Sequence, residues 1–187
     1  MKKIDNKLVS LVILFILNSS NLFSSTYNEE LLEVFSKIAP RLVVMSNQTD
    51  EIRSDINICV VNDPLDDKYG SLLIHKIQKN YPNGVKNYKL KLINTNYSGL
   101  NACQQADIAI MFDTDDQSIE KSLKFFNRNR ILTFSYNPKY LEYGVGVTLY
   151  IGKKVVPYIN LDALRKNRIE LDNTLIQISK IYGQEER

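Results

Sequence analysis

The chain has 187 residues, 44% of them hydrophobic and 24% charged, with a net charge of +3 and a single histidine. Residues 1–24 contain three lysines and one aspartate, so residues 25–187 have a net charge of only about +1. This excludes the strong basic patch expected of a nucleic-acid-binding protein. The length is typical of one domain with a substantial core.

The first 24 residues have the pattern of a secretory signal peptide. A basic start with three lysines precedes the apolar run Leu8–Leu17, and small polar residues follow it. This order is typical of an export signal, and the run is shorter than the roughly 18 residues that span a bilayer. We therefore predict a signal peptide at 1–24, cleaved near Ser24 or Ser25, and one soluble periplasmic α/β domain at 25–187.

Helices are expected where apolar residues recur at steps of three and four. Pro40 should kink or split the first of these helices, because proline removes a backbone donor and clashes with the preceding turn. The expected helices are Glu29–Met45, Asp67–Lys79, Gln117–Phe126, Leu161–Lys166 and Asn173–Tyr182, with a short helix or turn at Ser98–Gln105.

Short apolar runs between these helices predict strands. Because strands alternate with helices, the front of the sheet should be parallel. Near the end, Gly152-Lys153 is a hairpin signal. The predicted fold is α/β, with a Rossmann-like mixed sheet that is mostly parallel, has a C-terminal antiparallel hairpin and is flanked by helices. The expected strands are Ile56–Val61, Tyr88–Ile93, Asp107–Phe112, Arg130–Ser135, Gly146–Ile151 and Lys154–Ile159.

The chain contains two cysteines, Cys59 and Cys103. An even number in an oxidising compartment favours a disulfide. Cys59 lies in the first predicted strand and Cys103 just before another, so neighbouring parallel strands would bring them within reach. The alternative is two buried thiols, because free cysteine packs like a small hydrophobic residue.

Aspartates follow two of the predicted strands. Asp63 comes after the strand that ends at Val61, while Asp113, Asp115 and Asp116 come after Phe112. Ligand sites of open α/β sheets lie at such strand ends, so these carboxylates could hold Mg²⁺ or Ca²⁺ or line a small-ligand site. Capping of the following helices explains them with local sequence alone, and we favour that interpretation.

Groups that usually perform catalysis are scarce. His75 is the only histidine and lies in the middle of a predicted helix. The sequence has no G-x-S-x-G, no phosphate loop ending in G-K-[ST] and no H-E-x-x-H, which are signatures of common enzyme classes. We therefore expect no catalytic residues and no cofactor.

Tyrosines are concentrated near the C-terminal hairpin. Tyr136, Tyr140, Tyr143 and Tyr150 lie within fifteen residues. Exposed tyrosines favour protein contacts because each adds a large area with little entropy to lose. We predict that Tyr136, Tyr140 and Tyr143 bind a partner; the alternative is that they pack within the fold.

The order of several segments resembles that of the YfiR family of periplasmic proteins. The resemblance covers roughly Glu29 to Tyr182, nearly all of the predicted mature chain. It depends on the segments Ile56–Pro64, Cys103–Ala109, Ile131–Tyr136, Gly144–Val147 and Ile159–Leu164.

The resemblance implies a regulator rather than an enzyme. Family members are expected to hold an inner-membrane diguanylate cyclase inactive by contacting its periplasmic sensor region, which lowers cyclic di-GMP and biofilm formation. A sensor kinase is another possible partner, and a homodimer is possible. The resemblance also pairs Cys59 with Cys103, although this chain has no cysteines for the family's second pair.

Overall fold

The computed structural model describes residues 27–47 and 55–183. The predicted signal peptide, residues 1–24, lies outside the described residues. Within the described ranges, no helix combines the length and the apolar character needed to cross a membrane.

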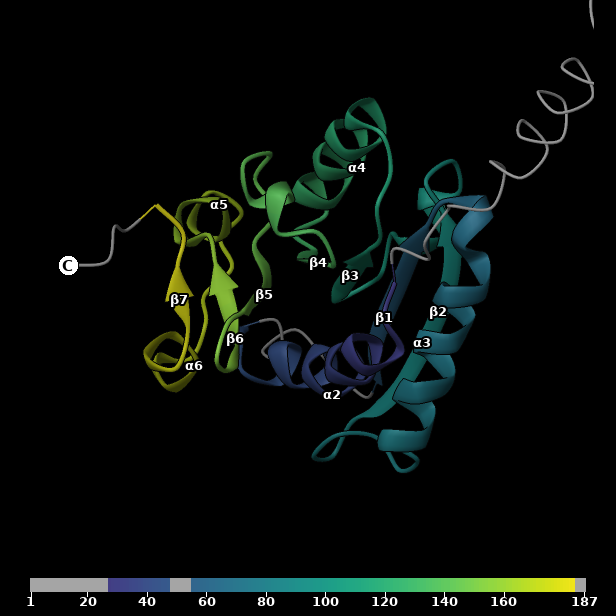
Figure 1. Cartoon of the computed structure of the whole chain (residues 1–187), viewed down its shortest axis with the longest axis horizontal. Coiled ribbons are helices and arrows are strands. Elements are labelled where there is room, and N and C mark those ends of the chain that lie inside the picture. Colours follow the sequence, from purple (N-terminus) through teal and green to yellow (C-terminus); the bar gives the residue numbers. More distant parts are fainter. Residues whose placement is uncertain (1–26, 48–54, 184–187) are drawn as a thin grey trace, which may run out of the picture.

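One seven-stranded sheet forms the centre of the molecule (Figure 1), with the strand order β2-β1-β3-β4-β5-β6-β7. Neighbours from β2 to β5 pair in parallel, β5 and β6 form an antiparallel hairpin, and β6 pairs in parallel with β7. This confirms the predicted mixed α/β sheet. The strands are β1 (Asp55–Asn62), β2 (Lys89–Asn96), β3 (Ile108–Met111), β4 (Leu132–Ser135), β5 (Val147–Ile151), β6 (Val155–Ile159) and β7 (Lys180–Ile181).

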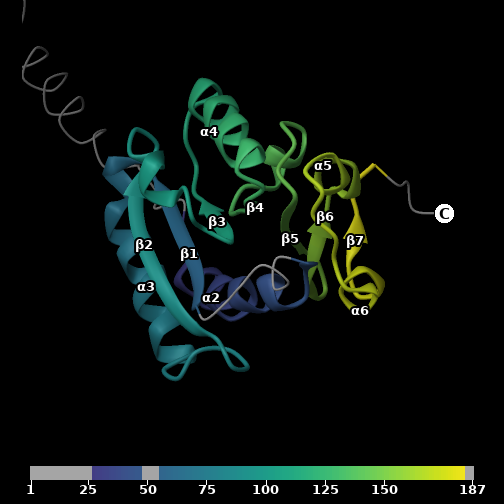
Figure 2. The same ribbon diagram turned by 180° about the vertical axis from the view of Figure 1, so that it is seen from behind.

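Helices cover both faces of this sheet. In both views, α5 and α6 lie beside β6 and β7, at the end of the sheet away from α3 and β2 (Figures 1 and 2). The α-helices are α2 (Glu29–Val44), α3 (Asp67–Asn80), α4 (Asp116–Arg128), α5 (Leu161–Lys166) and α6 (Asn173–Gln177). The short 3₁₀ helices η2 (Pro64–Asp66), η3 (Leu100–Cys103) and η4 (Pro138–Leu141) follow β1, β2 and β4.

Alternation along the central strands divides the core into two layers, because successive side chains of a strand point to opposite faces. On β1, Ile58 and Val60 belong to the cluster that includes α2 and α3. Cys59 and Val61 belong to the cluster that includes α4. Both faces of β1 are therefore buried, which explains its nearly continuous apolar sequence.

Of the two predicted effects of Pro40, a kink or a split of the first helix, the structure excludes the split. The structure has one helix, α2, that continues through Pro40 to Val44. Its buried face includes Phe35 and Ala39 before the proline and Val43 after it. Packing of this face against the sheet outweighs the roughly 3 kcal/mol that an interior proline costs.

The C-terminal helix is shorter than predicted. The expected helix Asn173–Tyr182 ends at Gln177, and Lys180–Ile181 form β7 instead. The Tyr182 amide donates to the Ile159 carbonyl oxygen at 2.8 Å, so the chain end extends the sheet beyond β6. Backbone pairing with β6 is a long-range interaction that overrides the helical spacing of this segment.

The sheet has a topological switch point between β1 and β3. From β1 the chain passes through α3 to β2 on one side, and then returns past β1 to β3 on the other side. Open α/β sheets bind ligands outside the carboxyl ends of the strands at this point. The residues that follow β1 and β3 therefore form the first candidate site.

Candidate functional site

Tyrosine hydroxyl groups hold the segment that follows β3. The Tyr97 hydroxyl donates to the Phe112 carbonyl oxygen. The Tyr140 hydroxyl accepts a hydrogen bond from the Thr114 amide at 2.8 Å and donates to the Thr114 carbonyl oxygen at 2.9 Å. One tyrosine that precedes β3 in the sequence and one that follows it thus fix the start of the loop that leads to α4.

Tyr27 binds Asp113, the residue between these two points of attachment in the sequence. Its hydroxyl accepts a hydrogen bond from the Asp113 amide at 2.9 Å and is also hydrogen-bonded to the Asp66 carboxylate. Its ring centroid lies 4.8–5.0 Å from those of three other aromatic rings, and its side chain is only 5% exposed. We call the surrounding residues the Tyr27 socket: Asp66, Tyr69, Phe112, Asp113 and Tyr136.

Residues of the Tyr27 socket also fix the start of α2. Asn28 caps this helix, because its side-chain oxygen accepts from the amides of Glu30 at 2.6 Å and Leu31 at 3.4 Å. The Asn28 amide in turn donates to the Tyr136 hydroxyl at 3.1 Å. The segment before α2 is therefore attached to the residues that follow β3 and β4.

Burial raises the pKa values of these phenols above the usual tyrosine value of about 10. Burial raises the pKa of the Tyr140 hydroxyl to about 12. It also raises the pKa of Tyr27 and Tyr136, and the Asp113 carboxylate adds to this effect. Burial raises the pKa of Asp66 as well, while the hydrogen bond from Tyr27 opposes the shift. The phenols can therefore act as hydrogen-bond donors throughout the physiological range.

Two of the three tyrosines predicted to bind a partner lie largely inside the fold. Tyr140 is only 5% exposed and is held by Thr114, so the expectation that its side chain offers a contact surface is wrong. Tyr136 is half-buried and stacks on Phe35. Tyr143 is 38% exposed, and partner binding through it stays a prediction.

Several of the predicted aspartates cap helices. Asp63 accepts from the Leu65 amide at 3.0 Å, at the start of η2. Asp115 accepts from the Ser118 amide at 2.9 Å, at the start of α4, and this bonding lowers its pKa.

The other two aspartates have different surroundings. Asp116 lies exposed in the first turn of α4 and is hydrogen-bonded to the Tyr143 hydroxyl. Asp113 belongs to the Tyr27 socket, where its Oδ1 is buried without a hydrogen-bond partner. Among the described residues, no group of three or more His, Cys, Asp or Glu side chains could hold a metal ion. The arrangement therefore gives no support to the metal alternative.

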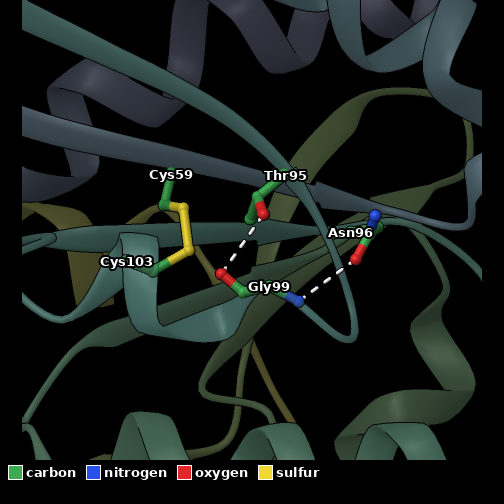
Figure 3. Close-up of a disulfide and its surroundings, with 5 residues drawn as sticks. All are labelled: Cys59, Thr95, Asn96, Gly99 and Cys103. Atoms are coloured by element: carbon green, nitrogen blue, oxygen red, sulfur yellow. Dashed lines mark hydrogen bonds between the residues drawn. A yellow bond between two sulfur atoms is a disulfide. The ribbon is translucent and has the colours of Figure 1, made fainter.

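The two cysteines form a disulfide between the sheet and η3. Cys59 of β1 is bonded to Cys103, and their Cα atoms are 5.6 Å apart. Both residues are fully buried. Figure 3 shows the turn that leads into η3, in which the Thr95 hydroxyl donates to the Gly99 carbonyl oxygen and the Gly99 amide donates to the Asn96 side chain. Covalent and hydrogen bonds therefore both fix the entry to β3.

Exposed apolar side chains gather at the end of the β5–β6 hairpin. Ile151 is 59% exposed and lies close in sequence to the exposed lysines of the hairpin turn, Lys153 and Lys154. α6 lies at this same end of the sheet (Figures 1 and 2). The Lys180 ammonium lies 4.0 Å from the centre of the Tyr150 ring. Ile151 is paired with Val155, which is 41% exposed. We call the surface formed by these two side chains the hairpin patch.

A second apolar surface lies beside α5. A groove of about 320 Å³ is formed by α5, α6 and the segment between them. Arg165 and Glu170 are its charged residues, and its other described lining residues are apolar. Both apolar surfaces are formed by β5 and the elements that follow it, and none of the Tyr27 socket residues lies in these elements.

Sequence analysis did not identify Tyr27 or Tyr97 as site residues. Their hydrogen bonds join residues that are 86 and 15 positions apart, and their partners are backbone atoms. No local pattern marks such a contact. The sequence did show polar residues following both β1 and β3. This pattern predicts where a site would lie, but it does not predict which tyrosines occupy that site.

Comparison with known proteins identifies a family and a fold. Residues 40–180 match the family described as DUF4154, YfiR/HmsC-like. Among curated proteins, none matches the chain.

Two solved structures resemble the fold. A conserved domain protein from Vibrio cholerae O1 biovar eltor has a TM-score of 0.58 and 13% identity over 80% of this chain. The ABC domain from Streptococcus pneumoniae, in complex with L-Trp, has a TM-score of 0.55 and 7% identity over 76% of this chain. The chain spans 59% of the length of each of these proteins. At such low identity, the likeness concerns the fold alone.

Proposed function

Because this chain belongs to the YfiR/HmsC-like family, we propose that it is a periplasmic regulator of a signalling enzyme in the inner membrane. It binds the periplasmic sensor region of that enzyme, a diguanylate cyclase in the simplest case, and holds it inactive. Cyclic di-GMP and biofilm formation fall as a result. The family match is the observation that carries this proposal.

The proposal includes export and one folded domain. Residues 1–24 act as the signal peptide, and residues 25–187 form the regulatory domain. The first 24 residues support this division, because a basic start is followed by an apolar run and then by small polar residues. The intact mass of the protein recovered from the periplasm tests it, because a mass that retains residues 1–24 would contradict export.

The hairpin patch is the proposed contact surface. Its apolar side chains would lose contact with water on binding, and each 100 Å² of apolar surface buried contributes roughly 2.5 kcal/mol before the costs of association. The lysines at its rim favour an acidic partner surface, since complementary charge speeds encounter and fixes orientation. Tyr143, the exposed member of the predicted tyrosine group, is a second candidate contact.

Inhibition requires that the regulator prefers one conformation of its partner. A ligand shifts a conformational equilibrium only by the difference between its affinities for the two states. Moving a cyclase from about 99% active to about 1% active therefore needs a preference of about 10⁴-fold for the inactive state. A rigid surface suits this role, and the hairpin is fixed through continuous pairing of β5 with β6.

Gene deletion and complementation test this function. Deleting the gene should raise cyclic di-GMP and surface attachment, and the wild-type gene should reverse both. Ile151→Asp should fail to reverse them, because it places a charge in the centre of the apolar contact. The variant should fold, since a substitution at an exposed position usually changes stability by less than about 0.5 kcal/mol.

Leu65→Asp is the matched control for this experiment. Leu65 is an apolar residue that is 89% exposed, but it lies on η2, outside the hairpin patch. This variant should complement as wild type does. If Ile151→Asp and Tyr143→Ala both repress fully, the contact surface lies elsewhere. If deletion leaves cyclic di-GMP unchanged where the cyclases are intact, the proposed function is wrong.

A further inference from the structure

The Tyr27 socket lies where doubly wound α/β proteins bind their ligands. Asp66 lies at the end of η2, directly after β1, and Asp113 follows β3. These two strands flank the switch point of the sheet, and ligands of open α/β sheets bind outside the carboxyl ends of such strands. In this structure, a side chain from the chain's own N-terminal region occupies that place.

The socket matches every part of a phenol. Tyr69, Phe112 and Tyr136 surround the ring, and their planes are tilted by 53–72° from the plane of Tyr27, a geometry that aromatic pairs favour. The Asp113 amide donates a hydrogen bond to the hydroxyl oxygen, and the hydroxyl group donates a hydrogen bond to the Asp66 carboxylate. Both the donor and the acceptor capacity of the hydroxyl group are therefore used.

Tyr27 differs from the other tyrosines here in how it is attached. Tyr97 and Tyr140 lie between strands of the central sheet. Tyr27 enters the socket from the residue before the Asn28 cap of α2. Within the described part of the chain, Tyr27 precedes every strand, so its side chain can leave without the displacement of a described strand.

We propose that the Tyr27 socket is a binding site for a small phenolic compound, which the side chain of Tyr27 fills in the absence of that ligand. The ligand's hydroxyl group takes over the hydrogen bonds to Asp113 and Asp66. Because Asn28 follows Tyr27 and caps α2, ligand binding also loosens the first turn of that helix. This site is independent of the proposed contact with a membrane enzyme.

Chemical complementation tests the site directly. Tyr27→Ala leaves a space of the shape of 4-methylphenol, which is the tyrosine side chain cut at its Cβ. Without ligand, this variant should melt at a lower temperature than wild type. Added 4-methylphenol should raise its melting temperature saturably, and at ten times the dissociation constant it should lower the unfolding equilibrium constant about elevenfold. Wild type should show a saturable shift only at higher concentrations, because the ligand must first displace the side chain of Tyr27.

Two controls separate this site from general binding of aromatic compounds. Toluene lacks the hydroxyl group, so it should bind Tyr27→Ala at least about tenfold more weakly, because it leaves the amide and the carboxylate unpaired. Tyr81→Ala removes a half-buried tyrosine outside the socket, whose hydroxyl donates to the Lys37 carbonyl oxygen at 2.6 Å. Neither compound should stabilise that variant.

A milder variant covers the case in which Tyr27→Ala does not fold. Tyr27→Phe keeps the ring but loses both hydrogen bonds, so 4-methylphenol should stabilise it at lower concentrations than wild type. Absence of a saturable shift in the folded Tyr27 variants would overturn the proposal. So would equal shifts with toluene, or an equal shift in Tyr81→Ala.

Discussion

Reduction of the disulfide between Cys59 and Cys103 should remove a large part of the stability of this fold. The bond joins residues that are 44 positions apart, and closing a loop of that length restricts the unfolded chain. In the chain-entropy model the restriction stabilises the folded state by about 4 kcal/mol at 25 °C. Domains of ordinary stability unfold with about 5–15 kcal/mol, so the reduced protein should be marginally stable.

Urea denaturation of the oxidised and the reduced protein measures this contribution. The chain has no tryptophan, so circular dichroism at 222 nm is a suitable signal. The free energy of unfolding should fall by about 4 kcal/mol on reduction, which is roughly a thousandfold change in the unfolding equilibrium constant. Reduced wild type is preferable to alanine variants for this measurement, because both cysteines are fully buried and truncation would add a cavity cost.

The double variant Cys59→Ala/Cys103→Ala is the control for the reductant. Dithiothreitol should leave its unfolding curve unchanged, because it has no bond to reduce. A loss of less than about 1 kcal/mol in wild type would refute the chain-entropy argument for this loop. It would then follow that the reduced, unfolded chain keeps contacts near η3 that already restrict it.

Two further predictions concern close packing and alkaline pH. Gly70→Ala should destabilise the protein by about 1–3 kcal/mol, because a Cβ atom there would clash with Asn62 Oδ1 and lie 2.6 Å from Asn94 Oδ1. As a control, His75 is exposed on the same helix, so His75→Ala should change the urea midpoint little. Stability should also fall as the pH rises from about 10, the usual tyrosine value, through the pKa of about 12 of folded Tyr140, since the folded state holds the phenol proton more tightly. A urea midpoint that is the same at pH 9 and pH 11 would contradict this second prediction.

The sequence predicts the central strands well because their burial leaves a direct pattern. β1 and β3 were expected at Ile56–Val61 and Asp107–Phe112, within one residue of the observed ends. Their apolar runs are short and are bounded by aspartates and turn residues, so local composition is sufficient. Cys59 and Cys103 were also close enough in the predicted topology to suggest the disulfide.

The parts that sequence analysis missed depend on contacts between distant residues. The short strand β7 forms through pairing with β6, although its sequence repeats with helical spacing. The role of Tyr140 depends on the backbone of Thr114, which a count of nearby tyrosines cannot reveal. Tyr27 is the clearest example, because its surroundings exist only once β1, β3 and α2 have come together.

The two outer strands of the sheet also affect how the molecule behaves at high concentration. An outer strand with free backbone groups can pair with another chain, and proteins reduce this risk with short strands and outward lysines. β7 has only two residues. On β2, Lys89 and Lys91 are exposed, and Lys91 forms an ion pair of 2.7 Å with Asp55. Both borders of the sheet therefore oppose strand-to-strand aggregation, which leaves contacts through side chains as the favoured route to specific association.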